Sequence, residues 1–167
     1  MPTLSDSQRE ELMAELGGLR RFCYSLTGNA ADADDLLQTT VEKLLHKGMP
    51  EDAHTAKWSY RVCKNVWIDE LRSRDVRQRY PSIADEEEES HSTEQVAEVE
   101  QEIAAVSAAL DKLPEDQRLA LSLVTIEGKT YAEAAEILEV PTGTIMSRIA
   151  RARKNLLQHY SPPNEED

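Results

Sequence analysis

The chain has 167 residues, enough for one ordinary domain or two small ones, and its low aromatic content of 5% with abundant Ala, Leu, Glu and Arg favours helices. No apolar run approaches the ~20 residues that cross a bilayer, and the polar start "MPTLSDSQREE" does not look like a signal peptide. The two cysteines and four histidines lie far apart without metal-ligand spacing. We therefore expect a cytoplasmic protein with reduced thiols, no membrane insertion, no metal site and no cofactor.

The formal net charge of −13 is distributed unevenly along the chain. Residues 1–80 hold 12 basic and 13 acidic side chains, for a net charge of −1. Residues 81–102 hold no basic and 9 acidic side chains (net −9), and residues 103–167 hold 7 basic and 10 acidic side chains (net −3). The last three residues, 165–167, are all acidic and supply that final −3. The acidity therefore belongs to a linker and a tail, and it does not exclude DNA binding by the folded parts.

The first two expected helices have clear boundaries. A capping box formed by Ser5 and Gln8 begins the first helix, and Gly28 ends it. Its apolar positions recur at helical spacing: Leu12, Leu16, Leu19, Phe22 and Leu26. The Gly17-Gly18 pair inside it predicts a kink or a close helix crossing. Asn29 then caps a second helix that ends before Gly48.

A third helix, expected from Thr55 to Arg79, mixes aromatic and basic side chains. Its tryptophans and valines are typical of a helical core. However, Arg61, Asn65 and Arg72 fall on one polar stripe, and stacking surfaces beside phosphate partners are what single-stranded nucleic acid requires. We expect Trp58 to be mainly buried. We expect Arg61, Lys64 and Asn65 to be exposed.

The second half of the chain is also helical in pattern. Residues 81–95 read as an acidic, mobile linker, after which an apolar stripe resumes over 96–113. A helix over 114–127, ended by Gly128, and a capping box at Thr130 follow. No strand pattern occurs. The predicted fold is all-α, with two small helical domains joined by an acidic flexible linker.

A short helix, a turn containing Gly and a basic helix at 130–160 form a helix-turn-helix pattern, whose second helix enters the DNA major groove. Its accessible side is expected to carry Thr142, Thr144, Ser147, Arg148 and Arg151. Arg153 and Lys154 are better placed for phosphates. The alternative is a solvated basic face on an ordinary helical hairpin.

Several segments of the sequence resemble a known family. "DADDLLQTTVEKLL" (32–45) and "WSYRVCKNVWIDELRSR" (58–74) resemble region 2 of an extracytoplasmic-function (ECF, group IV) sigma factor of the sigma-70 family. "ALDKLPEDQRLALSLVTIEGKTYAEAAEILEVPTGTIMSRIARARKNL" (109–156) resembles its region 4. The resemblance implies four segments: region 2 over 1–80, the acidic linker over 81–95, region 4 over 96–160 and an acidic tail over 161–167.

The resemblance also implies partners and roles. Asp35, Gln38 and Glu42 would bind RNA polymerase core at the clamp helices of its largest subunit, with a further contact at the flap. The loop 49–57 and the third helix would melt the −10 element and hold single-stranded DNA. The residues implied for that strand are Trp58, Arg61, Lys64, Asn65 and Arg72. The last helix would read the −35 element as duplex, and an anti-sigma factor is an implied partner.

Two departures from the family pattern occur. Thr39 stands where many members have an acidic residue, and Met146 stands where a Lys is common. Met146, with "NVWIDELR" and "SLTGNAADADDL", resembles the general-stress-response branch.

Three other classes of function make different demands on the sequence. An enzyme would need a catalytic constellation, and the acidic cluster at Asp32, Asp34 and Asp35 lies at a helix start that stabilises ionised carboxylates. A sigma mimic that sequesters an anti-sigma factor would not need DNA-reading residues. A simple helix-turn-helix repressor would leave the second and third helices without a role.

Overall fold

The computed structural model describes residues 3–78, 101, 105–106 and 108–160. The named elements run in the order α1 (Asp6–Thr27), α2 (Ala30–Lys47), α3 (Thr55–Gln78), α5 (Glu115–Leu121), η1 (Ser122–Ile126), α6 (Tyr131–Leu138) and α7 (Thr142–His159). The described residues form helices and connections with no strand, as expected for an all-α protein. The expected acidic linker 81–95 and tail 161–167 lie outside the described residues.

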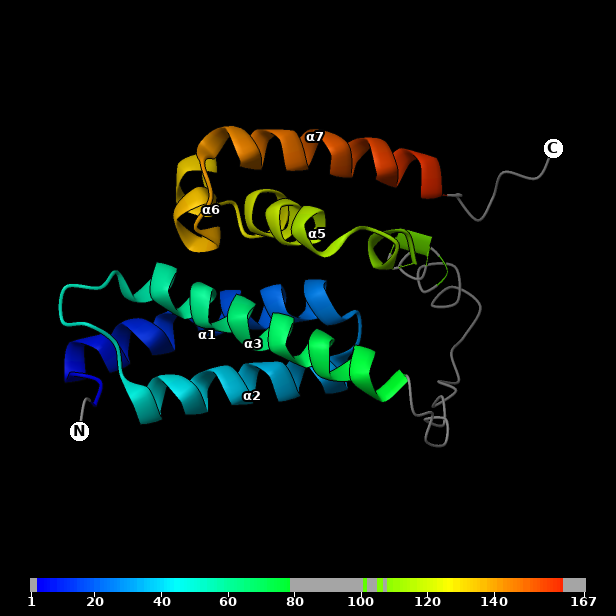
Figure 1. The fold of residues 1–167 in the computed structure, drawn as a ribbon. Helices are drawn as coiled ribbons and strands as arrows, with labels where there is room; N and C mark the ends of the chain where they lie inside the picture. The colour runs from blue at the N-terminus through cyan, green and yellow to red at the C-terminus, as the bar shows by residue number, and fades with distance from the viewer. Residues whose placement is uncertain (1–2, 79–100, 102–104, 107, 161–167) are drawn as a thin grey trace.

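The first half is a three-helix bundle of α1, α2 and α3 (Figure 1). The Ser5 hydroxyl accepts a hydrogen bond from the backbone amide of Gln8, and the side-chain carbonyl of Gln8 accepts one from the backbone amide of Ser5. The predicted capping box is therefore present. Gly28 ends α1 in the left-handed region at φ 80°, where a side chain would be strained. Asn29 caps α2 through the amide of Asp32, as predicted.

The second half departs from the expected single helix over 114–127. Pro114 immediately precedes α5, which changes after Leu121 into the wider π-helical turn η1. The amide of Glu127 donates to the carbonyl of Ser122, five residues back, at 3.0 Å. This wider turn replaces the last α-helical turn of the prediction.

The two halves pack against each other along α1 and α3. η1 contacts α1 and α6 contacts α3, while α7 forms the outermost layer in Figure 1. One cluster of buried apolar side chains continues from the bundle into the second half, where its members are Leu119, Ala120, Leu123, Ala134, Ala135, Ile137, Leu138, Ile145 and Ile149. The sequence predicted two helical units. It gave no prediction of how they are arranged.

Gly18 lies where α1 passes close to a side chain of α3 and to one of the second half. A Cβ atom at Gly18 would lie 2.5 Å from the Tyr60 hydroxyl and 3.2 Å from a carboxylate oxygen of Glu127, whereas one at Gly17 would meet nothing within 4 Å. The helix α1 is continuous through both glycines. The pair therefore marks a close crossing and not a break.

Both cysteines are free and fully buried in the bundle core, as the sequence predicted. The Sγ atoms of Cys23 in α1 and Cys63 in α3 are 3.5 Å apart. Hydrogen bonding between the thiols, together with burial, raises the pKa of Cys23 far above its usual range. A thiol held in its neutral form in an apolar core is a packing group and a poor nucleophile.

Candidate nucleic-acid interface

Helix α7 presents one apolar face and one basic face. Ile145, Ile149 and Ala152 are buried against α5 and α6. Thr142, Ser147, Arg151, Arg153 and Lys154 are exposed, and Thr144 and Arg148 are half-buried. The structure therefore places the predicted duplex-reading residues on the outward side of α7, the side that a recognition helix turns toward DNA.

Two of these side chains already have partners within the second half. The Nε atom of Arg148 lies 3.5 Å from a carboxylate oxygen of Asp116, at the start of α5. The Ser147 hydroxyl donates to the carbonyl of Gly143 at 3.1 Å. Met146, which replaces a cation common in the family, is 54% exposed on the same side. Arg151, Arg153 and Lys154 are thus the most accessible cations of this face.

Helix α3 carries the other predicted interface, and only part of it is open to solvent. Asn65 and Arg72 are exposed, as expected for Asn65. Trp58 is half-buried against the core, and the Arg61 guanidinium lies 5.5 Å from its ring centroid. The expectation that Trp58 is mainly core is therefore only partly met, because one face of the indole supports Arg61.

The expected exposure of Lys64 and Arg61 was wrong. Lys64 is only 8% exposed, and Arg61 is half-buried with its side chain 28% accessible. The reason is the second half of the chain, because α6 covers this part of α3. Burial lowers the pKa of Lys64, and the nearby Glu139 carboxylate acts in the opposite direction.

A buried carboxylate joins the two halves beside this covered face. The side chain of Glu127, which follows η1, is 1% accessible, and its Oε2 accepts from the Tyr60 hydroxyl at 3.1 Å. The Arg21 guanidinium from α1 lies 3.3 Å from the same oxygen. The ammonium group of Lys129 lies 4.8 Å from the Tyr60 ring centroid. Burial, followed by the charge of Glu127, raises the pKa of Tyr60 well above its usual range, so the phenol remains the donor.

The predicted polymerase-facing residues lie together on α2. Asp35, Gln38 and Glu42 are all exposed and recur at spacings of three and four, so they share one side of the helix. Thr39 is half-buried, and its hydroxyl donates to the carbonyl of Asp35 at 2.9 Å. The hydroxyl is thus occupied by its own helix, and this position offers a partner neither a charge nor a free donor.

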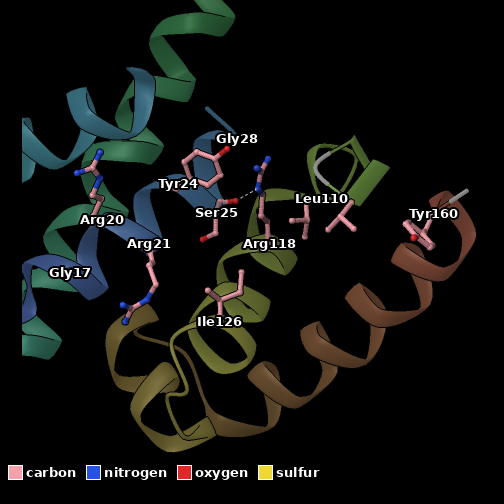
Figure 2. A pocket seen from close by; sticks show the side chains of 11 residues that line it. Gly17, Arg20, Arg21, Tyr24, Ser25, Gly28, Leu110, Arg118, Ile126 and Tyr160 are labelled. Carbon is pink, nitrogen blue, oxygen red and sulfur yellow. Dashed lines mark hydrogen bonds between the residues drawn. The ribbon is translucent and has the colours of Figure 1, made fainter. Parts of the chain in front are cut away.

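A groove of about 680 Å³ lies between α1 and the second half (Figure 2). Its lining combines exposed apolar side chains, Tyr24, Val106, Ile126 and Tyr160, with the cations Arg20 and Arg21. At its base the Nε atom of Arg118 donates to the carbonyl of Ser25 at 2.8 Å, the bond drawn in Figure 2. The groove is therefore apolar and cationic, and it is bordered by both halves of the chain.

Several residues at the junction make contacts that the sequence did not predict. They are Tyr60, Glu127, Lys129, Glu136 and Glu139. Helical periodicity carries no information on contacts between separate domains, so four of them have no signal in the sequence. Glu139 is the exception, because it occupies the turn of the helix-turn-helix, and its φ of 58° is a left-handed value that favours Gly or Asn, so a Glu in that turn is unusual.

The described residues bring no three His, Cys, Asp or Glu side chains into a group that would hold a metal ion. No helix among them is both long and apolar enough to cross a bilayer.

Comparison with known proteins identifies both halves of the chain. Residues 12–77 match the family Sigma-70 region 2, and residues 103–156 match the family Sigma-70, region 4. The ECF RNA polymerase sigma factor EcfG of Rhodopseudomonas palustris is 36% identical over 156 residues, which cover 92% of this chain and 84% of that protein.

Solved structures show the same arrangement of elements. The sigma factor RpoE of Bartonella quintana, crystallised with the anti-sigma factor NepR, superposes with a TM-score of 0.70 at 27% identity, covering 92% of this chain and 96% of RpoE. The anti-anti-sigma factor PhyR of the same organism, also complexed with NepR, shares the fold at 20% identity, with a TM-score of 0.60 over 87% of this chain and 47% of PhyR. With both regions present in order, and with a curated relative that it covers almost throughout, this chain belongs to the extracytoplasmic-function sigma factors of the sigma-70 family.

Proposed function

We propose that this chain binds RNA polymerase core and directs promoter-specific transcription initiation in the bacterial cytoplasm. The observation that carries the proposal is that each sigma region has a helix whose side chains would suit nucleic acid, α3 in region 2 and α7 in region 4. The face on α3 combines aromatic and basic groups suited to a single strand. The face on α7 is an exposed basic helix suited to a major groove.

The proposal divides the chain into region 2 over 1–80, a linker over 81–95, region 4 over 96–160 and a tail over 161–167. In region 2, the exposed α2 side with Asp35, Gln38 and Glu42 contacts the clamp helices of the largest polymerase subunit. In region 4, α7 reads the −35 element. A sigma factor contributes binding and not covalent chemistry, so no residue is given a catalytic role.

Within α3, the proposed contacts to the −10 strand divide into two groups. Asn65 offers both a donor and an acceptor to a base edge and is already exposed. Trp58, Arg61, Lys64 and Arg72 supply stacking surface and positive charge. Of these, Arg61 and Lys64 are the side chains that α6 covers in the free protein.

An anti-sigma factor is the proposed regulatory partner. Two structures similar to this one, the sigma factor RpoE and the anti-anti-sigma factor PhyR, were each solved with the anti-sigma factor NepR. The motifs that resemble the general-stress-response branch, including Met146, are what supports the proposed assignment to that branch. The groove between α1 and region 4 offers apolar and cationic surface from both regions, as an acidic amphipathic helix would require.

The rival function is a sigma mimic that sequesters an anti-sigma factor. PhyR shares the fold at 20% identity, and this likeness shows the fold alone, so it does not favour the rival. The exposed Asn65, Arg72 and Arg151 favour a sigma factor, because a decoy has no use for DNA-reading side chains.

Run-off transcription with purified polymerase core tests the proposal. The template pool should come from genomic fragments of the source bacterium, because the promoter sequence is not specified by the chain. Added protein should produce discrete transcripts that core alone does not. If the protein binds core yet yields no transcript from any fragment, it is not an initiation factor, and the mimic becomes the better assignment.

A further inference from the structure

The basic stripe of α3 faces an acidic edge of α6. Lys57, Arg61 and Lys64 recur at spacings of four and three, so they lie on one side of α3. Glu136 and Glu139 are three positions apart at the end of α6. The two edges meet within the folded chain, because α6 packs on α3.

Each cation of the stripe has a partner on α6. The Lys57 ammonium lies 2.6 Å from a carboxylate oxygen of Glu136. The Arg61 guanidinium donates to the backbone carbonyl of Glu136 at 2.8 Å and lies 3.6 Å from the Glu139 carboxylate. Lys64 completes the set, at 3.9 Å from the second oxygen of Glu139. Two carboxylates and one carbonyl thus present oxygens to the cations, as a phosphate backbone would.

We propose that Glu136 and Glu139 stand in for DNA phosphates on α3, so that region 4 covers the strand-binding face of region 2 in the free protein. Single-stranded DNA and α6 then compete for the same cations. This inference rests on the proposed function, in which α3 binds the −10 strand. It adds that the uncomplexed chain binds a single strand only when region 4 moves away.

The ion pairs between α3 and α6 are exposed and therefore weak, and the apolar cluster shared by the two halves is the larger contact that has to open. The side chains of Glu136 and Glu139 are 57% and 59% accessible, so their ion pairs lie at the rim and are screened by salt. Two buried polar atoms at the junction, Arg61 Nε and Glu127 Oε1, have no hydrogen-bond partner among the described residues. Buried polar groups left unpaired destabilise a contact, whereas a permanent core satisfies them.

The backbone of Glu139 adds an independent indication. Its left-handed φ of 58° is unfavourable for any residue with a Cβ atom, and the turn itself would be formed more easily by Gly. What Glu contributes at this position is a carboxylate that reaches both Arg61 and Lys64. The side chain therefore serves the contact with α3, and the turn does not require it.

The test uses the full chain and the double variant Glu136→Gln/Glu139→Gln, which keeps side-chain size and removes both charges. A matched control, Glu10→Gln/Glu115→Gln, removes the same net charge at exposed positions of α1 and α5. The first readout is hydrogen exchange of peptides from residues 55–64. The second is fluorescence anisotropy with a labelled 15-nucleotide strand of dT.

We expect faster exchange in residues 55–64 of the Glu136→Gln/Glu139→Gln variant and binding to the dT strand about five- to tenfold tighter than in the control. Glu139→Gly should change both readouts in the same direction while region 4 keeps its helical circular dichroism. If the variant and the control agree in exchange and in binding, α6 is not a cover. If exchange rises without tighter binding, α6 docks on α3 but does not stand in for DNA, and the inference also fails.

Run-off transcription separates this inference from the proposed function. If the wild-type chain supports transcription but the variant matches the control in exchange and dT binding, the sigma function stands and the proposal that α6 covers α3 is refuted. If the wild-type chain supports no transcription with polymerase core, the proposed sigma function is refuted. In that case, tighter dT binding by the variant would still show that α6 masks a nucleic-acid face.

Discussion

The hydroxyl of Tyr60 in α3 donates a 3.1 Å hydrogen bond to the carboxylate of Glu127 in region 4, and both side chains are almost fully buried. This bond joins the two sigma regions at a point that water scarcely reaches. Glu127 has one further partner on that oxygen, the exposed guanidinium of Arg21. Among the described residues, the pair is therefore one of two buried polar links between the regions, the other being the bond from Arg118 to the carbonyl of Ser25.

Replacing Tyr60 with Phe should weaken this link without disturbing the bundle. The ring would keep its edge-to-face contact with Phe22, whose centroid lies 5.2 Å away, while the Glu127 carboxylate would lose a donor. We expect a loss of about 1–3 kcal/mol in the free energy of unfolding measured by urea titration. Tyr24→Phe is the control, because Tyr24 is 46% exposed and should change stability little. Equal stability of the two variants would mean that the bond contributes nothing.

The two neighbouring glycines of α1 should respond to alanine in opposite directions. At Gly17 the added methyl meets open space, so Gly17→Ala should stabilise the protein by about 0.5–1 kcal/mol through helix propensity. At Gly18 the methyl would lie 2.5 Å from the buried Tyr60 hydroxyl, so Gly18→Ala should displace that group and destabilise the protein. Thermal unfolding followed by circular dichroism compares the pair directly. If both alanine variants are more stable than the wild type, the Tyr60 hydroxyl does not lie against Gly18.

On α7, Arg151 and Arg153 should behave differently in the holoenzyme. Arg151 lies closer to the start of the helix, and Arg151→Ala should cost about 1–3 kcal/mol on the correct −35 sequence and relax specificity there. Arg153→Ala should weaken binding to all sequences alike and lower the salt slope by about one unit. Competition binding of holoenzyme to promoter variants at two salt concentrations separates these effects. Neutral results for both would identify the basic face as solvated surface.

For the −10 strand, Asn65→Ala is the cleanest variant. Asn65 is exposed, while Arg61 also contacts Glu136 and Glu139, so truncating Arg61 would alter the docking of region 4 as well. We expect Asn65→Ala to reduce promoter opening, measured by permanganate reactivity, with unchanged affinity for polymerase core. Gln38→Ala on α2 should show the reverse, with weaker core binding. Loss of core affinity by Asn65→Ala would mean that its side of α3 has been misassigned.

The local structure was predictable because its signals are local. Ser5, Asn29 and Thr130 each cap a helix through a side chain that reaches only three residues along the chain. The buried face of α7 contains Ile145 and Ile149, whose spacing of four is itself a local helical signal. The residues on the polar side of α2, by contrast, were predicted only from the resemblance to the sigma family.

The docking of the two regions was not predictable from such signals. Lys64 is polar and was expected to be exposed, but it is buried where α6 packs on α3, and it lies 3.9 Å from Glu139, 75 residues later in the chain. The π-helical turn of η1 has no recognised sequence pattern, and it sets the path of the chain into Glu127. Contacts of this kind depend on how regions 2 and 4 pack together, which the hydrophobic pattern of each region alone does not specify.

The apolar cluster that runs from the bundle into region 4 bears on how long an unassembled molecule survives in the cell. If the regions separate before polymerase takes up the chain, side chains that are now shared between them face water, and exposed apolar surface is what proteases and chaperones recognise. When opening and closing are fast, degradation follows the population of the open form. Degradation would therefore be fastest for molecules whose regions separate when no free polymerase core is present to bind them. The concentration of polymerase core would then set the abundance of the protein.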